Sequence, residues 1–241
     1  MSGGKQGLAT LALSETQKRS LRDHVHESLR TAIISGRFTE NSRLNERLLA
    51  AELGVSTTPL KEAFRRLEAE GLIETLPRRG VRIRFGRAWA EEMILARAAL
   101  ESTIAAIAAE RIGDEQKQFL RDIIALMERA TQRARRSIDV DRLVALNTEF
   151  HALVHEASQC QHLTRLIERQ QFYDGRARRI IHNSVAERGV ALGEHRAIAE
   201  AIIAGRGTQA ERLMGAHVRR SGAQYLVRVF TAAGTRRILD A

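Results

Sequence analysis

The chain has 241 residues, of which 44% are apolar, and this is enough to build one large or two modest packed domains. Lysine and arginine number 39 against 29 aspartate and glutamate residues, so the net charge of +10 favours a polyanionic partner. The single cysteine, Cys160, excludes an internal disulfide. Residues 1–13 are expected to be a flexible tail, because their sequence is typical neither of a secretory signal nor of a membrane span. We therefore expect a cytoplasmic protein without a membrane partner.

A helix-turn-helix is predicted near the start of the chain. Apolar residues recur at helical spacing up to Ile33, and Gly36 follows as a helix terminator. A second, short helix is expected to end near Leu53, where Gly54 supplies a tight turn. Ser56 is then expected to cap a third helix with its side-chain oxygen.

The third helix is predicted to have two different faces. Its apolar residues fall at positions i, i+3, i+4 and i+7 and form one buried stripe, which consists of Leu60, Ala63, Phe64 and Leu67. Thr58, Lys61 and Arg65 share the opposite face. Hydroxyls at a helix N-terminus followed by cations suit phosphates and base edges, although such a face alone could equally be a solvated surface.

A β-hairpin is predicted after this helix. Two β-like runs, Leu72–Leu76 and Val81–Phe85, are joined by Pro77–Gly80, which contains two arginines and gives the hairpin a cationic tip. Apolar residues and arginines alternate in the second run, so one side should face the core. A helix suited to the major groove followed by a basic hairpin is typical of a winged helix-turn-helix domain, which we assign to residues 14–85.

The stretches Gly54–Phe64, Leu67–Leu72 and Pro77–Val81 agree in order and spacing with a known DNA-binding signature. They resemble that of the GntR family of bacterial transcription regulators. The resemblance implies binding of double-stranded DNA through Arg47, Ser56, Thr57, Thr58, Lys61, Arg65, Arg78, Arg79 and Gly80. The family usually has arginine at the positions of Thr57 and Lys61, and this departure changes the base sequence that would be preferred.

The rest of the chain, residues 86–241, is predicted to form an all-α antiparallel bundle, so the fold class is mainly α. Residues 86–89 are predicted to form a short junction between the two domains. The helical segments are expected near 90–112, 114–136, 139–158, 161–182, 189–204 and 208–231. The short connections between them imply antiparallel neighbours.

Asn147, His151, His195 and His217 are candidate ligands of a divalent metal ion. Asn147 and His151 lie one helical turn apart on a helix with an apolar face. His195 and His217 are equally far from Arg206, which lies in a predicted turn, so an antiparallel hairpin would place the two imidazoles level. Three imidazole nitrogens and an amide oxygen suit such a metal, and the alternative is a set of hydrogen-bonded core histidines.

The stretches Arg97–Glu101, Asn147–His151 and Glu194–Ile198, together with His217, resemble the FCD domain, which is the ligand-binding domain of the FadR subfamily of GntR regulators. The resemblance implies dimerisation and a metal held by an aspartate and three histidines; here Asn147 replaces the aspartate, and zinc or nickel is expected. It also implies a pocket for a small organic acid, whose carboxylate the metal and Arg97 would neutralise. Arg97 could equally pair with Glu101. His155 and His182 could approach the pocket, and we assign neither to it.

These observations predict a DNA-binding transcription regulator, expected to act as a repressor. It would bind an operator with two-fold symmetry as a homodimer, under the control of an organic acid effector. Two other classes stay open: a metal-dependent enzyme in the helical domain, and a non-specific DNA-packaging protein. Against an enzyme, the sequence has no paired nucleophile and base, no phosphate-binding glycine loop and no H-E-x-x-H motif, so we assign no catalytic residue.

Overall fold

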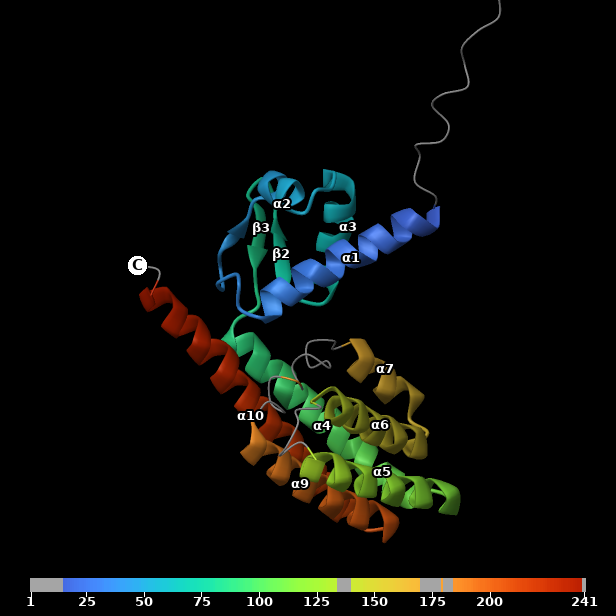
Figure 1. Ribbon diagram of the computed structural model, residues 1–241. Coiled ribbons are helices and arrows are strands. Elements are labelled where there is room, and N and C mark those ends of the chain that lie inside the picture. The colour runs from blue at the N-terminus through green and yellow to red at the C-terminus, as the bar shows by residue number, and fades with distance from the viewer. Residues whose placement is uncertain (1–14, 134–139, 170–178, 180–183, 240–241) are drawn as a thin grey trace, which may run out of the picture. The chain divides into compact units, whose positions relative to one another are not determined.

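A computed structural model describes residues 15–133, 140–169, 179 and 184–239 of the chain (Figure 1). The chain divides into two compact units, Met1–Gly86 and Arg87–Ala241. The first is a winged helix-turn-helix and the second is a bundle of helices, as the sequence predicts. Among the described residues, no helix is long and apolar enough to cross a membrane.

In the first unit, α1 (Glu15–Ile34) packs against α3 (Thr57–Ala69), with α2 (Glu46–Glu52) between them in the chain. As predicted, α1 ends where Gly36 adopts a positive φ of 79°, which lets the backbone N–H of Arg37 donate back to the carbonyl of Ala32 at 3.0 Å. A partly buried cluster of side-chain hydrogen bonds also joins α1 to the end of α3. Glu70 accepts from His26 Nε2 at 2.6 Å and from Arg30 Nε at 3.1 Å.

The turn between α2 and α3 confirms most of the sequence pattern. Gly54 has a φ of 64°, and the predicted apolar stripe of α3 is buried. The expected cap is wrong in one respect: Ser56 occupies the N-cap position but makes no capping hydrogen bond with its side chain. Asn45 instead caps α2, accepting from the backbone N–H groups of Arg47 and Leu48 at 3.0 and 3.1 Å. The hydroxyl of Ser56 therefore stays at the exposed surface.

The predicted hairpin consists of β2 (Ile73–Leu76) and β3 (Gly80–Ile83), paired antiparallel with Leu76 opposite Gly80. Its turn needs two positive φ angles, 60° at Arg78 and 81° at Gly80. The sheet also contains β1 (Arg43–Leu44), in the order β1-β3-β2, which the sequence pattern did not predict because two residues show no periodicity. Val81, Ile83 and Phe85 are buried, as their alternation with arginine predicts.

The second unit contains six labelled helices among its described residues: α4 (Arg87–Arg111), α5 (Asp114–Arg133), α6 (Val140–Ser158), α7 (Gln161–Arg169), α9 (Val185–Ile203) and α10 (Gly207–Leu239). Three boundaries correct the prediction. Residues 87–89 belong to α4 rather than to a junction, α9 starts at Val185 behind the N-cap residue Ser184, and α10 extends to Leu239. The predicted helix 161–182 is described only as far as Arg169 and at residue 179.

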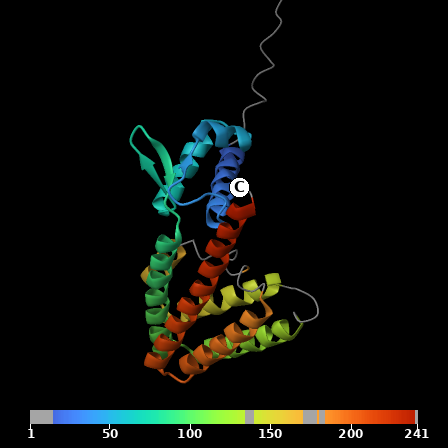
Figure 2. The ribbon, with the colours of Figure 1, turned by 90° about the vertical axis from the view of Figure 1, so that its left-hand side faces the viewer.

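The long helices α4 and α10 lie side by side (Figure 2). Two glycines of α10 face α4 at this seam. A Cβ atom on Gly222 would lie 2.5 Å from Cγ2 of Ile94, and one on Gly215 would lie 2.5 Å from Oγ of Ser102. The missing side chains therefore let the two helices approach closely. Side chains from α4, α5, α6, α9 and α10 then share one apolar core, which surrounds the predicted histidine positions.

Candidate metal centre and DNA-binding surface

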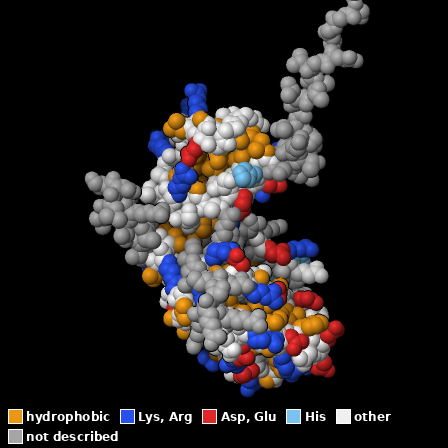
Figure 3. Space-filling model, in the orientation of Figure 1, with side chains coloured by type: hydrophobic (Ala, Val, Ile, Leu, Met, Phe, Trp, Pro, Cys, Tyr) orange, Lys and Arg blue, Asp and Glu red, His pale blue; other side chains and the backbone are white. Residues whose placement is uncertain are grey.

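The residues predicted to contact DNA are all exposed on the first unit. Ser56, Thr57 and Thr58 stand at the start of α3, with Lys61 and Arg65 on its next two turns. Arg47 lies on α2, Arg78 and Arg79 lie in the hairpin turn, and Gly80 begins β3 directly after it. Lys and Arg side chains project from the surface over α2 and the hairpin (Figure 3).

Two of these cations, Lys61 and Arg65, have carboxylate partners on the same surface, and so do Arg82 and Arg84 on the hairpin. Lys61 Nζ lies 3.6 Å from Glu46, and Arg65 Nη1 donates to Glu62 at 2.8 Å. On the hairpin, the hydrogen bond from Arg82 to Glu74 lowers the pKa of that exposed carboxyl. Exposed ion pairs contribute little to stability, so these cations can exchange a carboxylate for a phosphate at small cost.

Three buried histidines meet in the second unit. His151 comes from α6, His195 from α9 and His217 from α10, and one ring nitrogen of each lies within 4.8 Å of the others. The ring centroids of His195 and His217 are 4.5 Å apart, which confirms that the two imidazoles lie level on their helical hairpin. The turn between α9 and α10 contains Gly205 with a φ of 69°. Asn147, one turn before His151, is also buried.

Two carboxylates contact two of these histidines at their Nδ1 atoms. His151 Nδ1 lies 3.2 Å from Oε2 of Glu101, and His217 Nδ1 lies 2.7 Å from Oε2 of Glu194. Burial raises the pKa of Glu194, but hydrogen bonds from His217 and Arg220 outweigh it and lower the pKa to about 2. An ionised carboxylate favours the tautomer whose Nδ1 carries the proton, and this leaves the Nε2 lone pair for a metal.

Glu101 is fully buried and has two further partners. Its Oε1 accepts from Arg97 Nη2 at 2.8 Å, while its Oε2 also contacts His155 Nε2 at 2.8 Å. Burial raises the pKa of Glu101, but His151, His155 and Arg97 together hold it well below the ordinary value. The structure thus shows Arg97 in the ion pair with Glu101, one of the two roles considered for it. Its binding of an effector stays a prediction.

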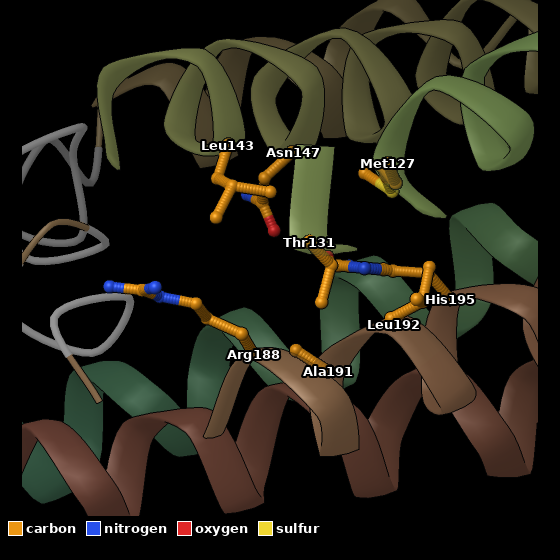
Figure 4. Close-up of a pocket in the computed structure, with 8 residues that line it drawn as sticks. All are labelled: Met127, Thr131, Leu143, Asn147, Arg188, Ala191, Leu192 and His195. Atoms are coloured by element: carbon orange, nitrogen blue, oxygen red, sulfur yellow. The ribbon is translucent and has the colours of Figure 1, made fainter. Parts of the chain in front are cut away.

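A pocket opens beside the histidines, between α5, α6 and α9 (Figure 4). Its lining consists of Met127, Thr131, Leu143, Asn147, Arg188, Ala191, Leu192 and His195. The amide oxygen of Asn147 points into it (Figure 4). Asn147 and His195, two of the four predicted metal ligands, therefore line this pocket. His182 falls outside the described residues.

Sequence reasoning missed Arg188, Glu194 and Glu101 as parts of the site. Arg188 escaped because the helix was expected to begin at residue 189, whereas α9 includes it two turns before His195 and on the same face. The partner roles of Glu101 and Glu194 depend on contacts between helices. Spacing along the chain does not encode these contacts.

Comparison with known proteins gives two family matches. Residues 21–83 match the model described as bacterial regulatory proteins, gntR family, and residues 92–220 match the FCD domain. The chain belongs to the GntR family. Because its second unit carries an FCD domain, it fits the FadR subfamily of these transcription regulators.

Its relatives are regulators from distant bacteria. The chain is 31% identical over 157 residues to the Nta operon transcriptional regulator of Aminobacter aminovorans, covering 62% of this chain and 72% of that protein. It is 31% identical over 158 residues to a probable D-xylose utilization operon transcriptional repressor of Paenarthrobacter nicotinovorans, covering 64% and 68%. A 30% identical match to the uncharacterized regulator YdhC of Bacillus subtilis covers 59% of this chain and 63% of that protein.

Solved structures agree on the fold. The Escherichia coli protein McbR/YncC aligns with a TM-score of 0.58 at 20% identity, over 85% of this chain and 96% of that one. These relatives are transcription regulators and not enzymes, so the comparisons favour regulation over the enzymatic alternative.

Proposed function

We propose that this GntR regulator is a repressor whose DNA binding responds to a small organic acid bound next to a divalent metal ion in the FCD domain. The observation that carries the proposal is the meeting of His151, His195 and His217 in a buried cluster beside a pocket. The name of the Paenarthrobacter relative, a probable repressor, supports repression.

The donor set fits a divalent metal. His151, His195 and His217 would each supply a nitrogen, and Asn147 an amide oxygen; zinc and nickel both suit imidazole. All four ligands are neutral, but Glu101 and Glu194 bring two negative charges against the back of two histidines. They would therefore offset part of the metal charge that an aspartate usually offsets. When bound, the metal would attract the carboxylate of an effector.

The first unit would read DNA through α3 and the hairpin. Thr57, Thr58 and Lys61 would approach base edges and phosphates of the major groove, and the exposed arginines of the hairpin the minor groove or backbone. We propose that the protein acts in the cytoplasm as a homodimer, which matches an operator with two-fold symmetry. The effector must bind two arrangements of the dimer with different affinity, because otherwise it would not change the equilibrium between them.

Enrichment of a random duplex pool by the purified protein tests this proposal. Metal-loaded protein should enrich a motif with two-fold symmetry at near-physiological salt. A panel of small organic acids should then include one that releases the enriched duplex from metal-loaded protein but not from protein stripped by a chelator. Binding without sequence preference that vanishes as salt rises would contradict the proposal and favour a non-specific DNA-packaging protein.

A further inference from the structure

The helices α4 and α10, which lie together along one edge of the second unit (Figure 2), expose apolar side chains. Leu95 of α4 is 59% exposed, and Val227 of α10 is 52% exposed. Ala99, one turn after Leu95, and Ala223, one turn before Val227, are exposed as well. Apolar residues that are scattered singly over a surface need no partner, but residues that gather on one face indicate an interaction site.

The exposed residues of the two helices lie on the same side of the pair. Gly222 of α10 faces Ile94 of α4, whereas Gly215, earlier in α10, faces a later residue of α4, so the helices run antiparallel. Leu95 follows Ile94 and Ala223 follows Gly222, and one residue turns the side chain by about 100° around its helix. In antiparallel neighbours, equal turns away from the seam lead to the same side. Leu95, Ala99, Ala216, Ala223 and Val227 therefore form one surface, the α4–α10 face.

Opposite charges lie on the two helices of this face. Glu92 of α4 is exposed one turn before Leu95, and Arg219 of α10 is exposed one turn before Ala223. Neither side chain has an ion-pair partner among the described residues. The same signs recur farther along the helices, in the exposed residues Glu110 and Arg212. The face is thus acidic along α4 and basic along α10.

We propose that the α4–α10 face is the surface through which two copies of the chain form the homodimer. The inference rests on the proposed function, which requires a homodimer. A two-fold axis parallel to the helices lays α4 of one copy on α10 of the other, so the acidic side meets the basic side twice. An axis across the helices would instead lay α4 on α4, and like charges would meet. The short side chains of Ala99, Ala216 and Ala223 let the facing helices approach closely.

The heights of the charged residues along the helices fit this arrangement. Because Gly222 lies level with Ile94, Glu92 and Arg219 differ in height by five residues, or about 8 Å along the axis. A rotation about an axis parallel to the helices keeps these heights unchanged. The long side chain of Arg219 of the partner subunit can therefore reach toward Glu92 across the interface.

Sedimentation equilibrium of the full-length protein tests the inference. Leu95→Arg should weaken the dimer by about 100-fold, because the two-fold axis places the substituted residue in the interface twice. Phe119→Arg is the matched control, since Phe119 is 51% exposed on α5, outside the α4–α10 face, and its substitution should leave the dimer unchanged. Circular dichroism checks that both variants fold.

Charge reversal tests the direction of the axis. Chains with Glu92→Arg and chains with Arg219→Glu should each self-associate at least about tenfold more weakly, because like charges then face one another twice. An equimolar mixture of the two chains should recover the affinity of the unmodified protein. In the mixed dimer each facing pair again joins a positive and a negative side chain.

A dimer that is as tight in Leu95→Arg as in the unmodified protein would overturn the inference, and the proposed homodimer would then use another interface. A mixture that does not recover would overturn the packing of α4 on α10. If the unmodified protein stays monomeric at about 100 μM, with and without the enriched duplex, both the inference and the proposed homodimer fail. Should Leu95→Arg not fold, the mixture of the two charge-reversed chains decides the question.

Discussion

The histidine cluster depends on single residues that are far apart in the sequence. Glu101 contacts a histidine 50 positions later, and Glu194 contacts one 23 positions later. Carboxylates behind metal-ligating histidines fix the ring orientation and the tautomer and raise the basicity of the ligand. Glu101 and Glu194 would have this effect on the histidines of the proposed metal site.

Glu194→Gln should weaken metal binding by about 10- to 100-fold, because a neutral amide oxygen accepts from Nδ1–H of His217 more weakly than a carboxylate does. Competition for zinc against a chromogenic chelator measures the change. Glu128→Gln is the matched control, since Glu128 is a half-exposed carboxylate that pairs with Arg196 outside the site. Equal zinc affinity in both variants would show that Glu194 serves only its ion pair with Arg220.

Asn147→Asp should strengthen zinc binding by about tenfold, or about 1.4 kcal/mol, because an anionic ligand replaces a neutral amide in a buried site. Asn147→Leu should weaken binding if the amide oxygen is a ligand. The same chelator competition measures both variants. If neither substitution changes the zinc affinity, Asn147 lines the pocket without binding the metal.

The sequence predicted that the three histidines point inward, because each lies on an apolar helical face. It also predicted that His195 and His217 lie level, because a turn lies midway between them. Their surroundings were not predictable in the same way. The pairing of Arg97 with Glu101 follows from their spacing on one helix, but the contacts of Glu101 with His151 and His155 depend on the packing of α4 against α6. Arg188 was missed because helix starts are weakly encoded by periodicity alone.

At the scale of whole elements, local patterns were the most informative. The buried stripe of α3 and the alternation of β3 follow directly from the spacing of apolar residues. By contrast, β1 is defined only by its pairing with β3, in which Arg43 lies opposite Arg82. The seam between α4 and α10 is likewise a tertiary feature, and two glycines of α10 decide how closely the helices approach.

Gly222→Ala should destabilise the second unit by about 1–3 kcal/mol, because the added methyl group would overlap Ile94 and force the helices apart. Thermal unfolding of the full chain measures the loss. The same substitution at Gly189 on α9 is the control. A Cβ there meets no atom within 4 Å, so Gly189→Ala should stabilise the helix by up to about 1 kcal/mol. Equal effects of the two substitutions would contradict the close seam.

At the scale of the molecule, the proposed control of DNA binding by an acid requires two sites that influence one another. The DNA-binding surface belongs to the unit Met1–Gly86, and the histidine cluster belongs to the unit Arg87–Ala241. Linkage requires that an acid which weakens operator binding is itself bound more weakly by the operator complex, by the same factor. The predicted DNA contacts and the proposed acid site lie in different units, so a substitution in one set leaves the residues of the other unchanged.

Lys61→Ala and Arg78→Ala should weaken DNA binding in two different ways. Lys61 lies on the exposed face of α3, so its loss should relax the base preference at one position by about 1–3 kcal/mol. Arg78 lies in the hairpin turn, so its loss should weaken all duplexes alike and reduce the salt slope by about one. Titration of the enriched duplex and a scrambled duplex at several salt concentrations separates the two effects. As a control, Arg196→Ala removes one positive charge from the other unit and should change neither the base preference nor the salt slope. An unchanged base preference in Lys61→Ala would show that another face of the first unit reads the bases.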